Sequence, residues 1–245
     1  MDMFTYHDVL AHLGVGGAHP GGLALTKELL KDLPIKQTSH ILDAGCGTGQ
    51  TAAFLAKTYG CQVTALDQHP LMVERARERF AREKVTIQLV EGDMENSTLA
   101  KESFDFIIAE SVTVFTNVTK TAREYIRLLR IGGMLLDLEM TAGAAFSADE
   151  VGDFQELYGL REIPIAEDWR SIFRNAGFHS VEIVKEHTVA HLLEGQSLQK
   201  DAFELQELNP LEPLDPSLYQ IWDKHQRLTE RFSNQLKYVV YKAEK

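Results

Sequence analysis

Carboxylates and glycines gather where short apolar runs end, a pattern that could bind a nucleoside ligand. Residues Ile41–Gln50 read Ile-Leu-Asp-Ala-Gly-Cys-Gly-Thr-Gly-Gln, with Gly45, Gly47 and Gly49 at alternate positions after an apolar run. Because glycine has no side chain, a ligand can lie directly against the backbone of such a turn. Asp43, at the edge of the turn, repels a pyrophosphate and favours a cationic or amine-bearing ligand.

The spacing of the glycines differs from that of a dinucleotide site. In the fingerprint GxGxxG, the third glycine follows three residues after the second, which corresponds to position 50 in this chain. That position is Gln50, and the additional glycine is Gly49. The turn therefore disfavours a nicotinamide dehydrogenase.

Two further carboxylates follow the next apolar runs. Asp67 closes the run that starts at Val63, where it could accept hydrogen bonds from both hydroxyls of a ribose or cap the following helix. Asp93 comes after Gly92, where it could accept the amine of an adenine ring or serve as a turn residue. Met94 could pack on that ring. The order of these carboxylates along the chain predicts a nucleoside site.

Alternating strands and helices would position these residues. We expect strands at 40–44, 62–66, 85–90, 104–109, 134–139, 179–189 and 236–241, and helices at 50–59, 70–83, 119–129 and 166–176. This alternation predicts an α/β fold with a mostly parallel sheet and right-handed crossovers. The ligand should then lie outside the carboxyl ends of the strands.

Composition narrows the classes of partner. The chain has 245 residues, a formal net charge of −11 and 44% apolar residues, so a basic face for nucleic acid is not expected. The longest apolar runs are too short to span a membrane, and the N-terminus lacks the features of a secretory signal. Two cysteines and nine histidines show no metal-ligand spacing. We therefore expect a cytoplasmic protein without a metal.

Several segments together resemble a known enzyme family. They are Leu42–Gly49, Ala65–Asp67, Glu91–Asp93, Ser103–Ile107 and Leu128–Gly133. In these segments the chain resembles the class I S-adenosylmethionine-dependent methyltransferases, of the small-molecule group that includes the ubiquinone-biosynthesis C-methyltransferases. The likeness covers roughly residues 38–140. Ile131 stands where the family usually has a proline before the double glycine, which weakens the signature of that turn.

The resemblance implies a Rossmann-like, doubly wound, seven-stranded sheet with helices on both faces and a helical lid insert. It also implies S-adenosylmethionine as cofactor, with S-adenosylhomocysteine as product. The cofactor-binding residues that it indicates are Asp43, Ala44, Gly45, Cys46, Gly47, Gly49, Asp67, Gln68, Met72, Gly92, Asp93, Met94 and Glu110. Asp43 would hold the methionine moiety, Asp67 the ribose and Asp93 the adenine. A sulfonium that carries an ammonium suits such an acidic set.

Two residues are candidates for catalysis near the methyl group. Transfer from a sulfonium is an in-line displacement that depends largely on positioning, so a general base is optional. Glu110, at the end of the fourth strand, could remove a proton from the acceptor or only contact the cofactor. The turn Ala18–Gly22 could simply start a helix, or it could fold over the site and bring His19 or Thr26 near the donor.

The domain organisation and the acceptor follow from what lies outside the resemblance. We expect residues 1–37 to form a helical cap over the cofactor and residues 38–245 to form the methyltransferase domain, with lid inserts at about 141–164 and 190–235. The acceptor should be a small molecule methylated on oxygen, nitrogen or carbon. A methyltransferase acting on RNA or protein, or a non-catalytic cofactor-binding protein, are the alternatives. A homodimer is compatible with the sequence.

Overall fold

The computed structural model describes residues 4–160, 162–191 and 214–245 of the chain. Its seven strands form one sheet in the order β3-β2-β1-β4-β5-β7-β6. The strands are β1 (His40–Ala44), β2 (Gln62–Asp67), β3 (Gln88–Glu91), β4 (Phe104–Glu110), β5 (Leu129–Ala142), β6 (Ser180–Thr188) and β7 (Leu236–Glu244). Strands β1 to β5 pair in parallel, whereas β7 runs antiparallel to both β5 and β6. The predicted mostly parallel, seven-stranded sheet is confirmed.

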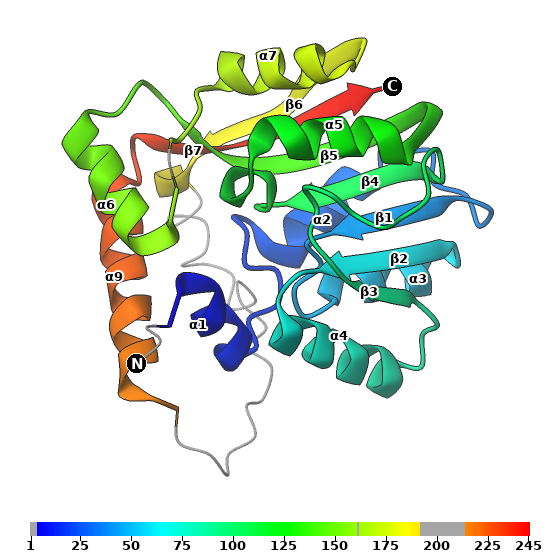
Figure 1. The fold of residues 1–245 in the computed structure, drawn as a ribbon, viewed down its shortest axis with the longest axis horizontal. Helices are drawn as coiled ribbons and strands as arrows, with labels where there is room; N and C mark the ends of the chain where they lie inside the picture. The colour runs from blue at the N-terminus through cyan, green and yellow to red at the C-terminus, as the bar shows by residue number, and fades with distance from the viewer. Residues whose placement is uncertain (1–3, 161, 192–213) are drawn as a thin grey trace.

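Helices cover both faces of this sheet (Figure 1). They are α1 (Tyr6–Leu13), α2 (Gly22–Leu30), α3 (Gln50–Tyr59), α4 (Pro70–Glu83), α5 (Val118–Leu128), α6 (Ala148–Tyr158), α7 (Ala166–Ala176) and α9 (Pro216–Phe232), with a short 3-10 helix η1 (Thr113–Phe115). Side chains alternate across a strand, so Ile107 packs in the cluster that holds α5 and α7, while Ile108 packs in the cluster that holds α2, α3 and α4. Two apolar cores therefore hold the strand ends in place.

Two strands begin several residues away from their predicted starts. Strand β3 begins at Gln88 rather than Val85, because the backbone N–H of Val85 donates to the carbonyl of Phe80 and closes the end of α4. Strand β5 begins at Leu129, before the predicted start at Met134. The pairing with β4 shifts register between those two residues, and Gly132 lies in the extra stretch with φ of +75°.

Three helices lie beyond the edge of the sheet to which the parallel strands point. In Figure 1 these are α1, α6 and α9, and α1 packs against both α4 and α9. The Asp8 Oδ1 atom of α1 also hydrogen-bonds to Nε2 of His69, the residue before α4, at 3.0 Å. Helices α6 and α9 belong to the two predicted inserts, of which residues 192–213 lie outside the described part of the chain. The division into cap and lids stays a prediction.

Within the described ranges, no helix has the length and apolar character needed to cross a membrane. The same part of the chain contains no cluster of three or more His, Cys, Asp or Glu residues that could hold a metal ion.

Candidate active site

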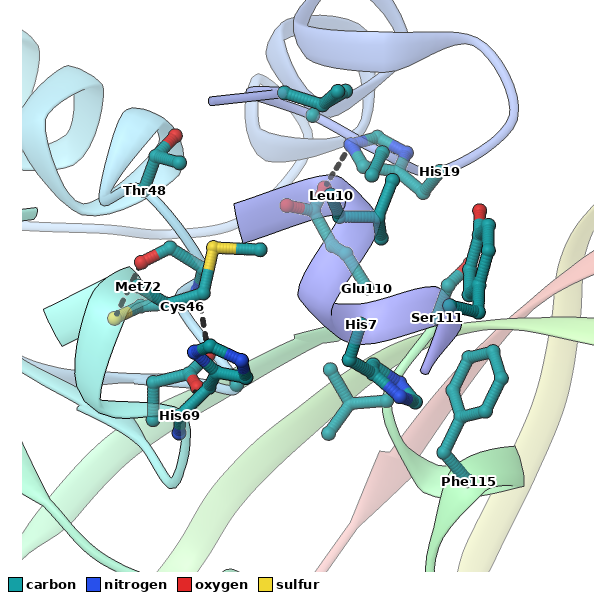
Figure 2. Close-up of a pocket in the computed structure, with 18 of the residues that line it drawn as sticks. His7, Leu10, His19, Cys46, Thr48, His69, Met72, Glu110, Ser111 and Phe115 are labelled. Atoms are coloured by element: carbon teal, nitrogen blue, oxygen red, sulfur yellow. Dashed lines mark hydrogen bonds and ion pairs between the residues drawn. The ribbon is translucent and has the colours of Figure 1, made fainter. Parts of the chain in front are cut away.

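A cavity of about 480 Å³ opens at the carboxyl ends of β1, β2 and β4 (Figure 2). The predicted site residues that line it are His19, Asp43, Gly45, Cys46, Gly47, Asp67, Gln68, Met72, Gly92, Asp93, Met94 and Glu110. Two predicted cofactor residues do not line it. Ala44 is fully buried in the sheet core, and Gly49 is the residue that precedes α3. The structure therefore brings most of the predicted set to one place.

The three glycines of the turn meet different surroundings. All have positive φ, at +67°, +52° and +77° for Gly45, Gly47 and Gly49. A Cβ on Gly45 would lie 2.4 Å from Val112 Cγ2, and one on Gly49 would lie 2.5 Å from Phe80 Cε1. A Cβ on Gly47 would have only the Met72 sulfur within 4 Å, at 4.0 Å. Close packing excludes side chains at Gly45 and Gly49, so Gly47 alone of the three faces space that a ligand could use.

The substitutions Gly45→Ala and Gly47→Ala should separate these two roles. Both impose a left-handed backbone on alanine, at a shared cost of about 1–2 kcal/mol. Gly45→Ala also overpacks the contact with Val112, which should lower the free energy of unfolding by about a further 1–3 kcal/mol. Urea unfolding of both variants tests this expectation. Equal losses of stability would show that the Val112 contact relaxes without cost.

Asp67 links the second strand to the glycine turn. Its Oδ2 accepts a hydrogen bond from the backbone N–H of Gly47, and its Oδ1 accepts one from the backbone N–H of His69, both at 2.8 Å. An ionised carboxylate has about four acceptor positions, so this side chain can still accept bonds from a ligand in the cavity. It therefore fits both roles expected from sequence, because His69 is the residue that precedes α4.

Asp43 and Glu110 place two carboxyl groups on the same side of the cavity. Asp43 is 3% exposed, and its buried Oδ2 has no hydrogen-bond partner among the described residues. Burial and the neighbouring charge of Glu110 raise the pKa of Asp43 well above its ordinary value. A buried carboxyl with an unused oxygen is costly unless something binds it. A ligand with a positive charge would relieve this cost.

The predicted cap residues contact Glu110 directly. Thr26 Oγ1 donates to Glu110 Oε1 at 2.5 Å, and Thr51 Oγ1 donates to Oε2 at 2.7 Å. His19 Nε2 lies 3.5 Å from Glu110 Oε1, as Figure 2 shows, and His19 is 5% exposed. The turn that carries His19 therefore folds over the end of β4, as one of the two interpretations of the sequence requires.

Asp93 lines the cavity two residues after the end of β3. Its Oδ1 accepts a hydrogen bond from the backbone N–H of Glu95 at 2.8 Å, which is the turn role expected as an alternative. The side chain is nevertheless exposed and lines the cavity beside Met94, which is 4% exposed. Both residues lie where the ring of a nucleoside in the cavity could contact them.

Aromatic rings form the part of the cavity that sequence reasoning described least well. Tyr158 lines it, whereas Trp169 and Phe232 are buried in the main core and Trp222 packs in the cluster around α1. His7 and His225 also line the cavity, although no motif singled them out. They reach it through the packing of α1 and α9, a contact between distant segments that carries no local sequence signal.

Comparison with known proteins places this geometry in a family. Residues 41–133 match the family model described as a methyltransferase domain. The uncharacterized methyltransferase YodH of Bacillus subtilis (strain 168) is 31% identical over 246 residues, which cover 99% of this chain and 100% of that protein. A phosphoethanolamine N-methyltransferase of Triticum aestivum is 28% identical over 172 residues, but these cover only 33% of that protein.

A solved structure shows the same fold. Phosphoethanolamine N-methyltransferase 2 of Haemonchus contortus, in complex with S-adenosyl-L-methionine, aligns with a TM-score of 0.77 at 19% identity. The alignment covers 100% of this chain and 58% of the worm protein. With a relative that matches over its full length, and with the glycine turn and strand-end carboxylates in place, the chain belongs to the class I S-adenosylmethionine-dependent methyltransferases.

Proposed function

We propose that this enzyme transfers the methyl group of S-adenosylmethionine to a small molecule, with its donor held along the ends of β1, β2 and β3. The unpartnered Oδ2 of buried Asp43, beside Glu110, is the observation that carries the proposal. The ammonium of S-adenosylmethionine supplies the positive charge that this pair of carboxyl groups lacks. A dinucleotide, with its negative pyrophosphate, would add repulsion instead.

The remaining contacts follow the order of the strands. Asp67 accepts hydrogen bonds from the ribose hydroxyls while it holds the glycine turn through Gly47. Asp93 accepts the amine of the adenine, and Met94 packs against the ring. Gly47 leaves room for the ligand against the backbone. The bound cofactor supplies an electrophilic methyl group, and the chain orients it and excludes water.

In this proposal Glu110 binds the donor, and His19 positions Glu110. Both oxygens of Glu110 already accept bonds from the hydroxyls of Thr26 and Thr51, which fix the side chain where a cofactor ammonium can reach it. The buried side chain of His19 lies next to Glu110 Oε1, the oxygen that Thr26 contacts. The cap and β4 thus converge on the charged end of the donor.

Small-molecule acceptors are consistent with the named relatives. Besides the phosphoethanolamine enzymes, an O-methyltransferase of Pyrenophora dematioidea is 30% identical over 165 residues, which cover 61% of that protein. These relatives act on different atoms, and their names support only the class of acceptor. Incubating the chain with methyl-labelled S-adenosylmethionine and a metabolite extract tests the proposal. Failure of the full chain to bind S-adenosylmethionine in calorimetry would refute it.

Glu110→Gln distinguishes donor binding from proton removal. If Glu110 holds the ammonium, the neutral amide should weaken the binding of S-adenosylmethionine by about tenfold, since one charge-assisted interaction contributes about 1.5 kcal/mol or more. At saturating cofactor, kcat and its pH profile should then stay unchanged. A fall in kcat with an altered pH profile and unchanged affinity would instead identify Glu110 as the base. Glu91→Gln, at the exposed end of β3, is the matched control.

A further inference from the structure

The cavity continues beyond the donor residues into a part bounded by aromatic rings. We name Tyr6, Phe115, Tyr158 and His225 the ring subsite. Tyr6 comes from α1, Phe115 from η1, Tyr158 from α6 and His225 from α9. Tyr6 meets Tyr158 edge-on at 4.8 Å between centroids and stacks on His225 at 4.9 Å. Segments far apart in sequence thus converge on one apolar wall.

The ring subsite is uncharged at neutral pH. Burial lowers the pKa of His225 to about 4, and its Nδ1 lies 2.8 Å from the hydroxyl of Tyr158. Burial likewise raises the pKa of Tyr158 to about 12 and that of Tyr6 further. All four rings therefore remain neutral, and the wall favours an apolar molecule over an ion.

Fixed charge elsewhere in the cavity disfavours an anionic acceptor. Among the lining residues that the structure describes, the only lysine or arginine is Lys237, and it is paired with Glu186 at 2.5 Å. Four carboxyl groups line the donor part, namely Asp43, Asp67, Asp93 and Glu110. Among these described residues a phosphorylated acceptor would find no free cation and would meet a surplus of negative charge.

His7 lies between the donor residues and the ring subsite. In Figure 2 its side chain projects from α1 toward Phe115, and the two rings meet edge-on at 4.7 Å. No hydrogen bond joins its ring nitrogens to any residue in the described part of the chain. Burial lowers the pKa of His7, and the charge of Asp67 opposes that shift. A neutral imidazole with an available nitrogen is suited to accept a proton.

We propose that the ring subsite binds an uncharged, flat apolar acceptor that carries a weakly acidic hydroxyl, and that His7 removes the proton of that hydroxyl. This inference rests on the proposed function. The acceptor oxygen bonds to the methyl carbon as the carbon–sulfur bond breaks, and the electron pair of that bond stays on sulfur. The hydroxyl proton passes to His7 and then to solvent. The products are a methyl ether and S-adenosylhomocysteine.

Three naphthalene probes test the class of acceptor. They are 1-naphthol, 1-naphthylmethylamine and 1-naphthyl phosphate, which share a ring system and differ in charge. With the full chain saturated in S-adenosylhomocysteine, the naphthol should bind at least about tenfold more tightly than the phosphate, because the phosphate loses solvation without gaining a cation. Tighter binding of the phosphate or of the ammonium compound would overturn the proposal. Failure to bind S-adenosylhomocysteine would instead count against the proposed function.

His7→Gln tests the role of the imidazole in transfer to phenols. With labelled S-adenosylmethionine and a panel of uncharged phenols, kcat should fall about 100-fold, the low end for a lost general base. The affinities for cofactor and phenol should stay close to those of the wild type. His12→Gln, on the same helix, is the control for damage to α1 and should retain activity.

The pH profile provides a readout that a structural role would not move. Because the pKa of His7 is lowered, wild-type kcat should decline on the acid side with a midpoint below 6.5, where the imidazole becomes protonated. Asp8, Asp67 and His69 also face this ring and set the position of that midpoint. The acid limb should disappear in His7→Gln. A retained limb with unchanged kcat, or no phenol methylated by the wild type while cofactor binds, would contradict the assignment.

Discussion

Asp67→Ala should weaken the binding of S-adenosylmethionine by about 100-fold or more. In the proposed site this carboxylate accepts two hydrogen bonds from the ribose, and bonds to a charged acceptor contribute about 1.5–3 kcal/mol each. The substitution also removes the acceptor for the backbone N–H groups of Gly47 and His69, so the turn loses its connection to β2. Calorimetric titration of the folded variant measures the loss.

Asp105→Ala is a matched control for this effect. Asp105 also accepts a backbone hydrogen bond, from the N–H of His40 at 2.7 Å, but at the start of β4 and far from the cavity lining. Its removal should cost stability while leaving cofactor affinity unchanged. Asp67→Asn keeps one acceptor oxygen for the turn. Its affinity for S-adenosylmethionine should lie between those of the wild type and Asp67→Ala. Binding by Asp67→Ala as tight as that of the wild type would remove Asp67 from the cofactor site.

Glu139→Gln should lower the free energy of unfolding by about 3 kcal/mol, because a buried donor left without its acceptor costs about 1–3 kcal/mol and this carboxyl group accepts from three backbone donors. Glu139 lies on β5 and is fully buried. Its carboxylate accepts the backbone N–H groups of Val112, Thr113 and Val114, at 3.0, 2.7 and 3.2 Å. A glutamine would present N–H donors to part of this set. Urea unfolding measures the loss.

Glu139 also supports the glycine turn indirectly, through the segment that it holds. The segment held by Glu139 carries Val112, whose side chain packs where a Cβ on Gly45 would stand, and it leads into Phe115 of the ring subsite. Glu139→Gln should therefore also weaken cofactor binding in the fraction that remains folded. A variant with wild-type stability would show that the three backbone groups find other partners.

Asp137→Asn should lower the free energy of unfolding less than Glu139→Gln does. Asp137 is fully buried next to Glu139, and its oxygens accept from the hydroxyl of Thr113 at 3.1 and 3.3 Å. Burial, together with the charge of Glu139, raises the pKa of Asp137 well above its ordinary value, so a neutral side chain is the favoured state. Asparagine is neutral and keeps both a donor and an acceptor. Its cost should be well below that of Glu139→Gln.

The pair also makes stability depend on pH. Burial raises the pKa of Glu139 from 4.5 to about 7. A carboxyl whose pKa is raised on folding stabilises the protein most below its unfolded pKa, and this contribution is lost as pH rises through the folded value. Asp137→Asn keeps Glu139 but removes the second carboxyl whose pKa is raised, so the wild type should lose more stability than this variant as pH rises above 4.5. Parallel curves for the two proteins would show that folding does not raise the pKa of Asp137.

The chain sequence by itself predicted the sheet and three carboxylates at one edge of it. Apolar periodicity is a local property, and it located all seven strands and the helices α3, α4, α5 and α7. The carboxyl ends of parallel strands lie at the same edge of a sheet. The sequence therefore predicted that Asp43, Asp67 and Asp93 lie near one another. The glycine spacing, with Gln50 in the frame, then separated a sulfonium nucleoside from a dinucleotide.

The tertiary structure alone decided what each group touches. Gly45 and Gly49 excluded side chains because Val112 and Phe80, distant in sequence, pack against them. His7 had no motif around it, because its position depends on how α1 docks against α4 and α9. In the sequence Glu139 is an ordinary residue of a predicted strand. Only the structure shows that the turn after β4 donates hydrogen bonds to its side chain. Contacts between segments far apart in sequence leave no periodic signal, and such contacts form the ring subsite.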